Sequence, residues 1–291
     1  MGRSVVSAAA ACLAILAGSV VPTLASEPLN IVVTIPVLKD FADRIGGAHV
    51  KVVSLLSGRE NEHTYSPRPS DLAAVRRAQV VIQIGLGLEV WVGALLRNAG
   101  HPGVLVVTTS EGVERIAGHD GGNPHIWLDP ENARQMVRQI AGALSAADPA
   151  HAADYHANED RYLGELRALE ADLLRHLRPI VDRRIVVHHP AWPYFANRFG
   201  FQIVGEIVAQ SGAEPSARHL QALAKTIREE RIRVIVSEPQ LNQKLPRILA
   251  QESGARVVVL TAMPGGVPGT DSYLDMLRYN VLQLAQALQA S

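Results

Sequence analysis

The stretch PAHAADYHANEDRYLGELRALEADLLRHL, residues 149–177, separates two halves of similar pattern. Its apolar residues recur at the spacing of one helical face, at Tyr162, Leu163, Leu166, Leu169, Leu173 and Leu174. This spacing predicts one long amphipathic helix, which we assign to residues 149–180. Because a helical connector is stiff, we expect the segments on either side of it to be held in a nearly fixed relation.

On both sides of this helix, short β-branched runs alternate with amphipathic segments. Before it we expect strands at 30–35, 50–55, 79–84 and 103–108 and helices at 37–45, 70–78 and 88–99. After it we expect strands at 184–188, 201–204, 234–238 and 256–260. This alternation is typical of parallel sheets whose strands are buried on both faces. The sequence therefore predicts an α/β fold with two parallel-sheet lobes, residues 26–148 and 181–291, joined by one long rigid helix.

Composition supports a folded, two-lobed chain. The chain has 291 residues, of which 47% are hydrophobic, a length and composition that suit two packed lobes and argue against a disordered chain or a coiled coil. The 28 basic side chains are matched by 28 acidic ones, so the formal net charge is zero. The chain therefore lacks the excess of basic residues that is typical of nucleic-acid-binding proteins.

The N-terminus has the pattern of a secretory signal peptide over residues 1–25. Arg3 precedes an apolar run from Val5 to Val21, and the small residues Thr23 and Ala25 predict cleavage before Ser26. The run is shorter than the ~20 residues that a membrane anchor needs. A lipoprotein cleavage before Cys12 would leave too short an apolar segment ahead of it. We therefore expect a soluble protein exported to the periplasm, without disulfides because Cys12 leaves with the leader.

Three histidines stand out as candidate metal ligands. His63, His125 and His189 each follow a predicted strand or precede a predicted helix. Ligands of open parallel sheets gather at the carboxyl ends of the strands, and two facing lobes form a cleft there. Neutral imidazoles bind zinc, which takes three or four ligands in a tetrahedral arrangement. Because these histidines are far apart in sequence and form no local chelating motif, a shared site depends on the fold bringing their loops to one cleft.

Several motifs resemble one family in the same order along the chain. They are Glu62-His63-x-Tyr65-x-Pro67, Pro124-His-Ile-Trp-Leu-Asp-Pro130, His189-x-Ala-Trp-x-Tyr194-Phe195, Glu214-Pro-Ser216, Ser237-Glu-Pro239 and the run from Asp271 to Asn280. In these residues the chain is similar to the zinc and manganese substrate-binding proteins of bacterial ABC importers, the cluster A-I solute-binding proteins. The resemblance covers essentially the whole chain after the leader. It implies two lobes joined by a long helix, a metal ion between them, and no hydrolytic activity.

Carried over motif by motif, the resemblance assigns His63, His125 and His189 as metal ligands. Because side chains alternate along a strand, we interpret His188 as a structural residue or as one that supports a ligand, and keep it as the fallback ligand. Many members of the family carry an aspartate at the position that Thr261 occupies here. Threonine is a poor zinc ligand. The fourth position is therefore left to water or to the carboxylate of Glu62 or Glu238, and Glu238 could equally orient a ligating imidazole.

The ligand types favour zinc over manganese, because manganese prefers carboxylate-rich sites whereas imidazole suits zinc. Many zinc-importing relatives carry a long loop rich in histidine and acidic residues ahead of the second ligand. Here only His119 and Asp120 stand in the matching stretch, which we interpret as a polar turn. A chain without a capturing loop could receive its metal from a metallochaperone.

The leading hypothesis is a monomeric periplasmic carrier that binds one zinc ion and delivers it to an ABC transporter permease in the inner membrane. The principal alternative is a zinc-dependent hydrolase or lyase, because three histidines and a water are also the ligands of a catalytic zinc. No nucleophile or general-base motif accompanies the histidines, which favours the carrier. A manganese carrier and a metal-binding adhesin are less favoured alternatives.

Overall fold

The computed structural model of the chain describes residues 2, 27–116, 121–208 and 214–289. The predicted leader, apart from Gly2, and the pair His119 and Asp120 lie outside these ranges. Of the helices in the described part of the chain, none combines the length and the apolar character needed to cross a membrane.

Two four-stranded parallel sheets form the two lobes, as the sequence predicts. The first has the order β2-β1-β3-β4 and the second the order β6-β5-β7-β8, so the two lobes share one topology. The strands are β1 (Leu29–Val33), β2 (Val50–Ser54), β3 (Val80–Gln83), β4 (Leu105–Thr108), β5 (Arg184–Val187), β6 (Gln202–Glu206), β7 (Val234–Ser237) and β8 (Arg256–Val259).

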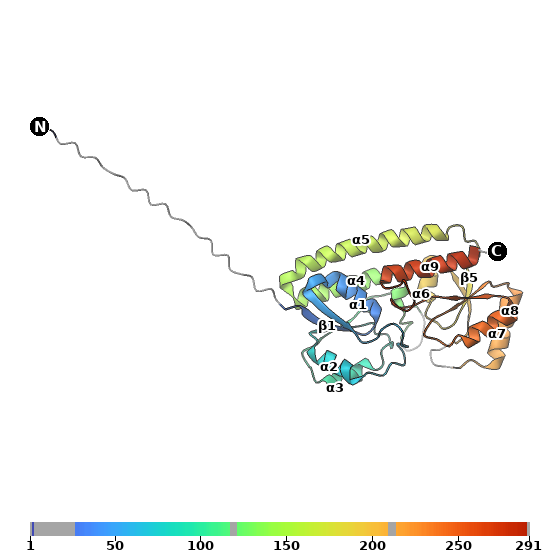
Figure 1. The fold of residues 1–291 in the computed structure, drawn as a ribbon, viewed down its shortest axis with the longest axis horizontal. Coiled ribbons are helices and arrows are strands. Elements are labelled where there is room, and N and C mark those ends of the chain that lie inside the picture. The colour runs from blue at the N-terminus through green and yellow to red at the C-terminus, as the bar shows by residue number, and fades with distance from the viewer. Residues whose placement is uncertain (1, 3–26, 117–120, 209–213, 290–291) are drawn as a thin grey trace.

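The helices connect and cover these strands (Figure 1). They are α1 (Pro36–Gly46), α2 (Pro69–Arg77), α3 (Val92–Ala99), α4 (Pro130–Ala147), α5 (Ala152–Leu177), α6 (Pro193–Phe199), α7 (Ala217–Glu229), α8 (Lys244–Ser253) and α9 (Tyr273–Gln289). Short 3-10 turns precede two of them, η2 (Ile126–Leu128) before α4 and η3 (Pro149–His151) before α5.

The expectation that every strand is buried on both faces is wrong for the edge strands. The central strands β1, β3, β5 and β7 are almost entirely buried, whereas β2, β4, β6 and β8 are partly exposed. An edge strand has a neighbour on one side only, so part of it faces water.

The expectation of a helix from residue 88 is also wrong in its start, since α3 begins at Val92. The buried Glu89 carboxylate instead closes the preceding loop by accepting the backbone N–H groups of Ile84 and Gly85 at 2.8 and 2.9 Å. The Thr34 hydroxyl donates to the same carboxylate at 2.7 Å. These bonds hold the carboxyl end of β3 in a tight turn.

Helix α5 confirms the prediction of a long helix between the lobes. It runs along one side of the molecule and packs on α1 and α4 of the first lobe and on α9 (Figure 1). Its buried residues include Leu166 and Leu173, which belong to one apolar core that extends from the first sheet through β5 of the second. Leu174 does not join the buried face, because it is 38% exposed. A shared core fixes the lobes more firmly than a connecting segment alone would.

Candidate metal centre

Three loops from the two lobes meet at the carboxyl ends of their strands. His63 lies between β2 and α2, His125 immediately precedes η2, and His189 follows β5 by two residues. More than sixty residues separate His63 from His125, and more than sixty separate His125 from His189, yet the structure brings the three side chains together. This is the place where an open parallel sheet binds its ligands.

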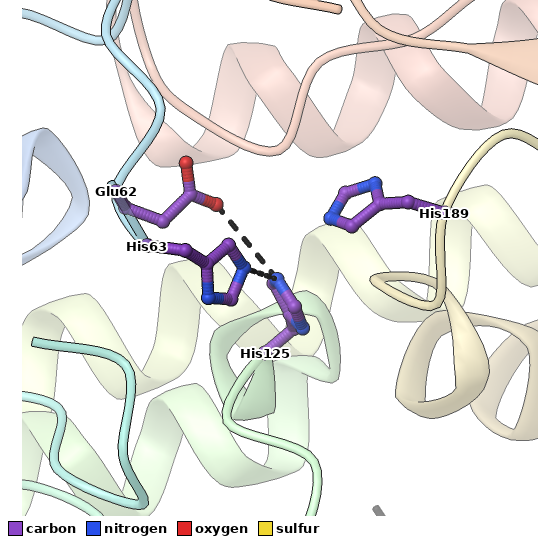
Figure 2. A group of neighbouring side chains, drawn as sticks. All are labelled: Glu62, His63, His125 and His189. Atoms are coloured by element: carbon purple, nitrogen blue, oxygen red, sulfur yellow. Dashed lines mark hydrogen bonds and ion pairs between the residues drawn. The ribbon is translucent and has the colours of Figure 1, made fainter. Parts of the chain in front are cut away.

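The three imidazoles converge with a carboxylate. Glu62, His63, His125 and His189 each offer one ligand atom, and these four atoms lie within 4.8 Å of one another (Figure 2). The Nε2 atoms of His63 and His125 are 3.2 Å apart. The ring of His189 enters from the other lobe, with its centroid 5.2 Å from that of His125.

These spacings fit one small cation. Two nitrogens bonded to a tetrahedral zinc at 2.0–2.1 Å are separated by about 3.3–3.4 Å. The 3.2 Å between the Nε2 atoms of His63 and His125 is already close to that value. The widest separation between two of the four ligand atoms is at most 4.8 Å. Binding of an ion would therefore shorten that distance by at most about 1.5 Å.

Burial isolates the group from water. Glu62, His125 and His189 are 1%, 2% and 3% exposed, and only His63 is partly exposed. The Glu62 Oε1 atom has no hydrogen-bond partner among the described residues and lies 3.7 Å from Nε2 of His125. A buried carboxylate oxygen without a partner is costly, and a cation at this position would satisfy it.

Glu238 lies behind His189. Its carboxylate oxygens are 3.0 and 2.9 Å from Nδ1 of His189, and Oε1 also accepts the indole N–H of Trp192 at 2.9 Å. With Nδ1 directed to the carboxylate, Nε2 of His189 is left to face the other lobe. Glu238 thus orients an imidazole, one of the two roles that the sequence left open for it.

The remaining candidates do not join the group. The Thr261 hydroxyl donates to the carbonyl of Met263 at 2.7 Å, so it is engaged within its own turn. Nδ1 of His188 lies 2.9 Å from the Ser237 hydroxyl, and His188 is not among the side chains that converge with His63, His125 and His189.

The loop that carries His125 is held by the second lobe. The indole N–H of Trp127 donates to the carbonyl of Ala262 at 2.7 Å, and the Tyr273 hydroxyl donates to the carbonyl of Trp127 at 2.6 Å. The side chain of Asn123 also bonds across the lobes, a role that sequence analysis missed because its partner is distant along the chain.

Burial shifts the ionisation of the group. It raises the pKa of Glu62 to about 7 and lowers the pKa of His63 to about 4. Burial and the neighbouring imidazoles hold the pKa of His125 well below its usual value. Burial alone would lower the pKa of His189, but the adjacent Glu238 carboxylate outweighs it and the pKa is raised. The imidazoles of His63 and His125 are therefore neutral and able to bind a metal at neutral pH.

We expect metal affinity to fall on acidification. Below about pH 7 a metal must displace the proton held by Glu62, which costs about tenfold in affinity per pH unit, and more where His189 is also protonated. Chelator competition for zinc across this pH range measures the slope. Glu62→Gln should make the slope shallower, since one titrating ligand is gone. A wild-type affinity that stays constant from about pH 7 to pH 5 would contradict the expectation.

Two parallel-sheet lobes around a buried cluster of three imidazoles and a carboxylate define a metal-binding solute-binding protein. The chain belongs to the family described as zinc-uptake complex component A, periplasmic, whose family model matches residues 31–287. The family resemblance that the sequence motifs indicate is confirmed.

Individual relatives differ in the metal that they are named for. The chain is 30% identical over 260 residues to the manganese-binding lipoprotein MntA of Halalkalibacterium halodurans, covering 88% of this chain and 87% of that protein. It is 26% identical over 311 residues to the high-affinity zinc uptake system protein ZnuA of Brucella abortus, covering 91% and 93%. A crystal structure of ZnuA matches with a TM-score of 0.82 and 30% identity, covering 90% of this chain and all of the other.

Proposed function

We propose that this protein captures one zinc ion with His63, His125, His189 and Glu62 and delivers it to an ABC transporter permease. The observation that carries the proposal is the convergence of these four ligand atoms, from both lobes, in a buried position. Four ligands of this kind complete the tetrahedral arrangement that zinc prefers.

The donor set and the local charge support zinc over manganese. Three imidazole nitrogens and one carboxylate oxygen suit zinc, whereas manganese favours oxygen-rich sites. Glu62 supplies one negative charge directly, and the Glu238 carboxylate lies against the far side of the His189 ring. Two carboxylates would balance the two positive charges of the ion, which lowers the free-energy cost of burying zinc here.

A closed set of ligands favours a carrier over an enzyme. A catalytic zinc keeps one position open for water or substrate, whereas a zinc with four protein ligands does not. In this proposal Glu62 occupies the position that a hydrolase or lyase would leave to water. The relatives named above are named for metal binding or uptake, in agreement with a carrier.

The role of Glu62 can be separated from that of Glu238. We expect Glu62→Gln to weaken zinc binding by more than about 100-fold, because a ligand and its charge are lost, and Glu238→Gln by about 10- to 100-fold, the usual cost of losing a partner of a ligating imidazole. Chelator competition at neutral pH measures both. Equal and small effects of the two substitutions would remove Glu62 from the ligand set and leave a site of three imidazoles and water.

Export and partners complete the proposal. We infer that residues 1–25 form a leader cleaved before Ser26 and that the chain acts in the periplasm as a monomer, without nucleic acid. The apolar run of the leader and the periplasmic description of the family support this placement. A metallochaperone is proposed as an additional source of metal.

A further inference from the structure

A single buried amide connects the metal-binding segments of the two lobes. Asn123 is 5% exposed, and its Nδ2 donates to the carbonyl of Pro190 at 2.6 Å. Its Oδ1 accepts the backbone N–H of His125 at 3.0 Å and lies 2.9 Å from Nδ1 of the same residue. Since Pro190 directly follows His189, one side chain contacts the segments of two candidate ligands from opposite lobes.

These contacts fix the orientation of the amide. A carbonyl oxygen can only accept a hydrogen bond, so the NH2 group of Asn123 must face Pro190. The amide oxygen must then face His125, and because that oxygen can also only accept, Nδ1 of His125 must carry a proton.

The proton on Nδ1 decides which nitrogen of His125 can bind a metal. A neutral imidazole has one N–H, so Nε2 keeps its lone pair. Nε2 is the atom that lies 3.2 Å from Nε2 of His63 and 3.7 Å from the unpartnered Oε1 of Glu62. The amide of Asn123 therefore directs the free lone pair of His125 into the cluster.

We propose that Asn123 is a positioning residue for metal capture, which fixes the metal-binding tautomer of His125 and ties its loop to the His189 segment. The inference rests on the proposed function. A ligating histidine commonly donates its second N–H to a protein acceptor that fixes its orientation. Glu238 takes this place for His189 and Asn123 takes it for His125, so the two acceptors differ by one charge.

The backbone bond of Asn123 is not what distinguishes it. Asn61 accepts the backbone N–H of His63 at 2.9 Å, two residues ahead, in the same pattern. This local turn is therefore common to both histidine loops of the first lobe. Asn123 differs from Asn61 because it also contacts the ring of its histidine and bonds to Pro190 in the other lobe.

The tautomer can be read directly from the metal-free protein by long-range ¹H–¹⁵N correlation of its histidine rings. The wild type should show His125 protonated at Nδ1. Asn123→Leu should populate both tautomers and weaken zinc binding by about 10- to 100-fold. Asn123→Asp should keep the Nδ1–H signal, because a carboxylate oxygen still accepts from the ring. An Nε2–H tautomer in the wild type or in Asn123→Asp would overturn the proposal.

Asn132, in the first turn of α4, provides a matched control because it bonds to the same loop. It is a buried amide that donates to the carbonyl of Ile126 at 3.2 Å. Asn132→Leu should keep the Nδ1–H signal of His125 and a zinc affinity close to that of the wild type. Equal effects of the leucine substitutions at Asn123 and Asn132, or an unchanged tautomer and affinity in Asn123→Leu, would overturn the proposal. Failure of the proposed function would look different, since the wild type itself would not bind zinc while its tautomer could still be measured.

Discussion

The chain without residues 1–25 is expected to take up about one zinc ion when dialysed against equal concentrations of zinc and manganese, and to lose that ion when His63, His125 and His189 are all changed to alanine. The reason is that three of four ligands disappear from one buried cluster. Loss of one residue that hydrogen-bonds a ligating imidazole typically costs about 10- to 100-fold in metal affinity. Loss of three direct ligands should therefore reduce zinc binding below detection at about micromolar metal.

The matched control removes the same number of imidazoles elsewhere. His101, His156 and His176 lie outside the cluster, and changing all three to alanine should leave zinc uptake intact. Metal content by elemental analysis measures both variants. Zinc that survives the first triple substitution, or that is lost equally in both, would remove the basis of the proposed function. Preferential uptake of manganese by the wild type would reverse the assigned metal.

Trp127→Ala is expected to lower the free energy of unfolding by about 3–5 kcal/mol. The Trp127 ring is fully buried, and its N–H satisfies the carbonyl of Ala262 in the other lobe. Alanine would leave both a cavity and an unpaired buried carbonyl. Zinc affinity should fall as well, because the Trp127 ring packs against His125 with 5.3 Å between centroids.

Denaturant unfolding of the metal-free protein measures this loss. Trp127→Phe serves as the control, since it keeps most of the ring and removes mainly the bond to Ala262, at an expected cost of about 1–3 kcal/mol. A loss below about 1 kcal/mol in Trp127→Ala would show that this loop is not a structural contact between the lobes.

Local pattern was enough to predict the architecture. The β-branched runs predict all eight strands of the described chain, and the helical spacing around Leu166 predicts α5. These signals are local, because a strand or an amphipathic helix depends on residues close together in the sequence. The same local signals did not distinguish edge strands from central strands. The order of strands in a sheet depends on how distant segments pair, which the composition of a single strand does not show.

The cluster was predictable only in part. Sequence motifs singled out His63, His125 and His189, but they left open whether water, Glu62 or Glu238 completes the set. The choice depends on which carboxylate oxygen lies beside the converging nitrogens of all three histidines, a property of loops that meet only in three dimensions. The reach of Asn123 to Pro190, across 67 residues, is of the same kind.

Anomalous diffraction at the zinc edge from crystals of the zinc-loaded protein tests the central claim most directly. We predict a single strong peak within bonding distance, about 2.0–2.2 Å, of Nε2 of His125, Nε2 of His189, a ring nitrogen of His63 and a carboxylate oxygen of Glu62. A peak at another place, or one whose protein ligands all come from a single lobe, would contradict it.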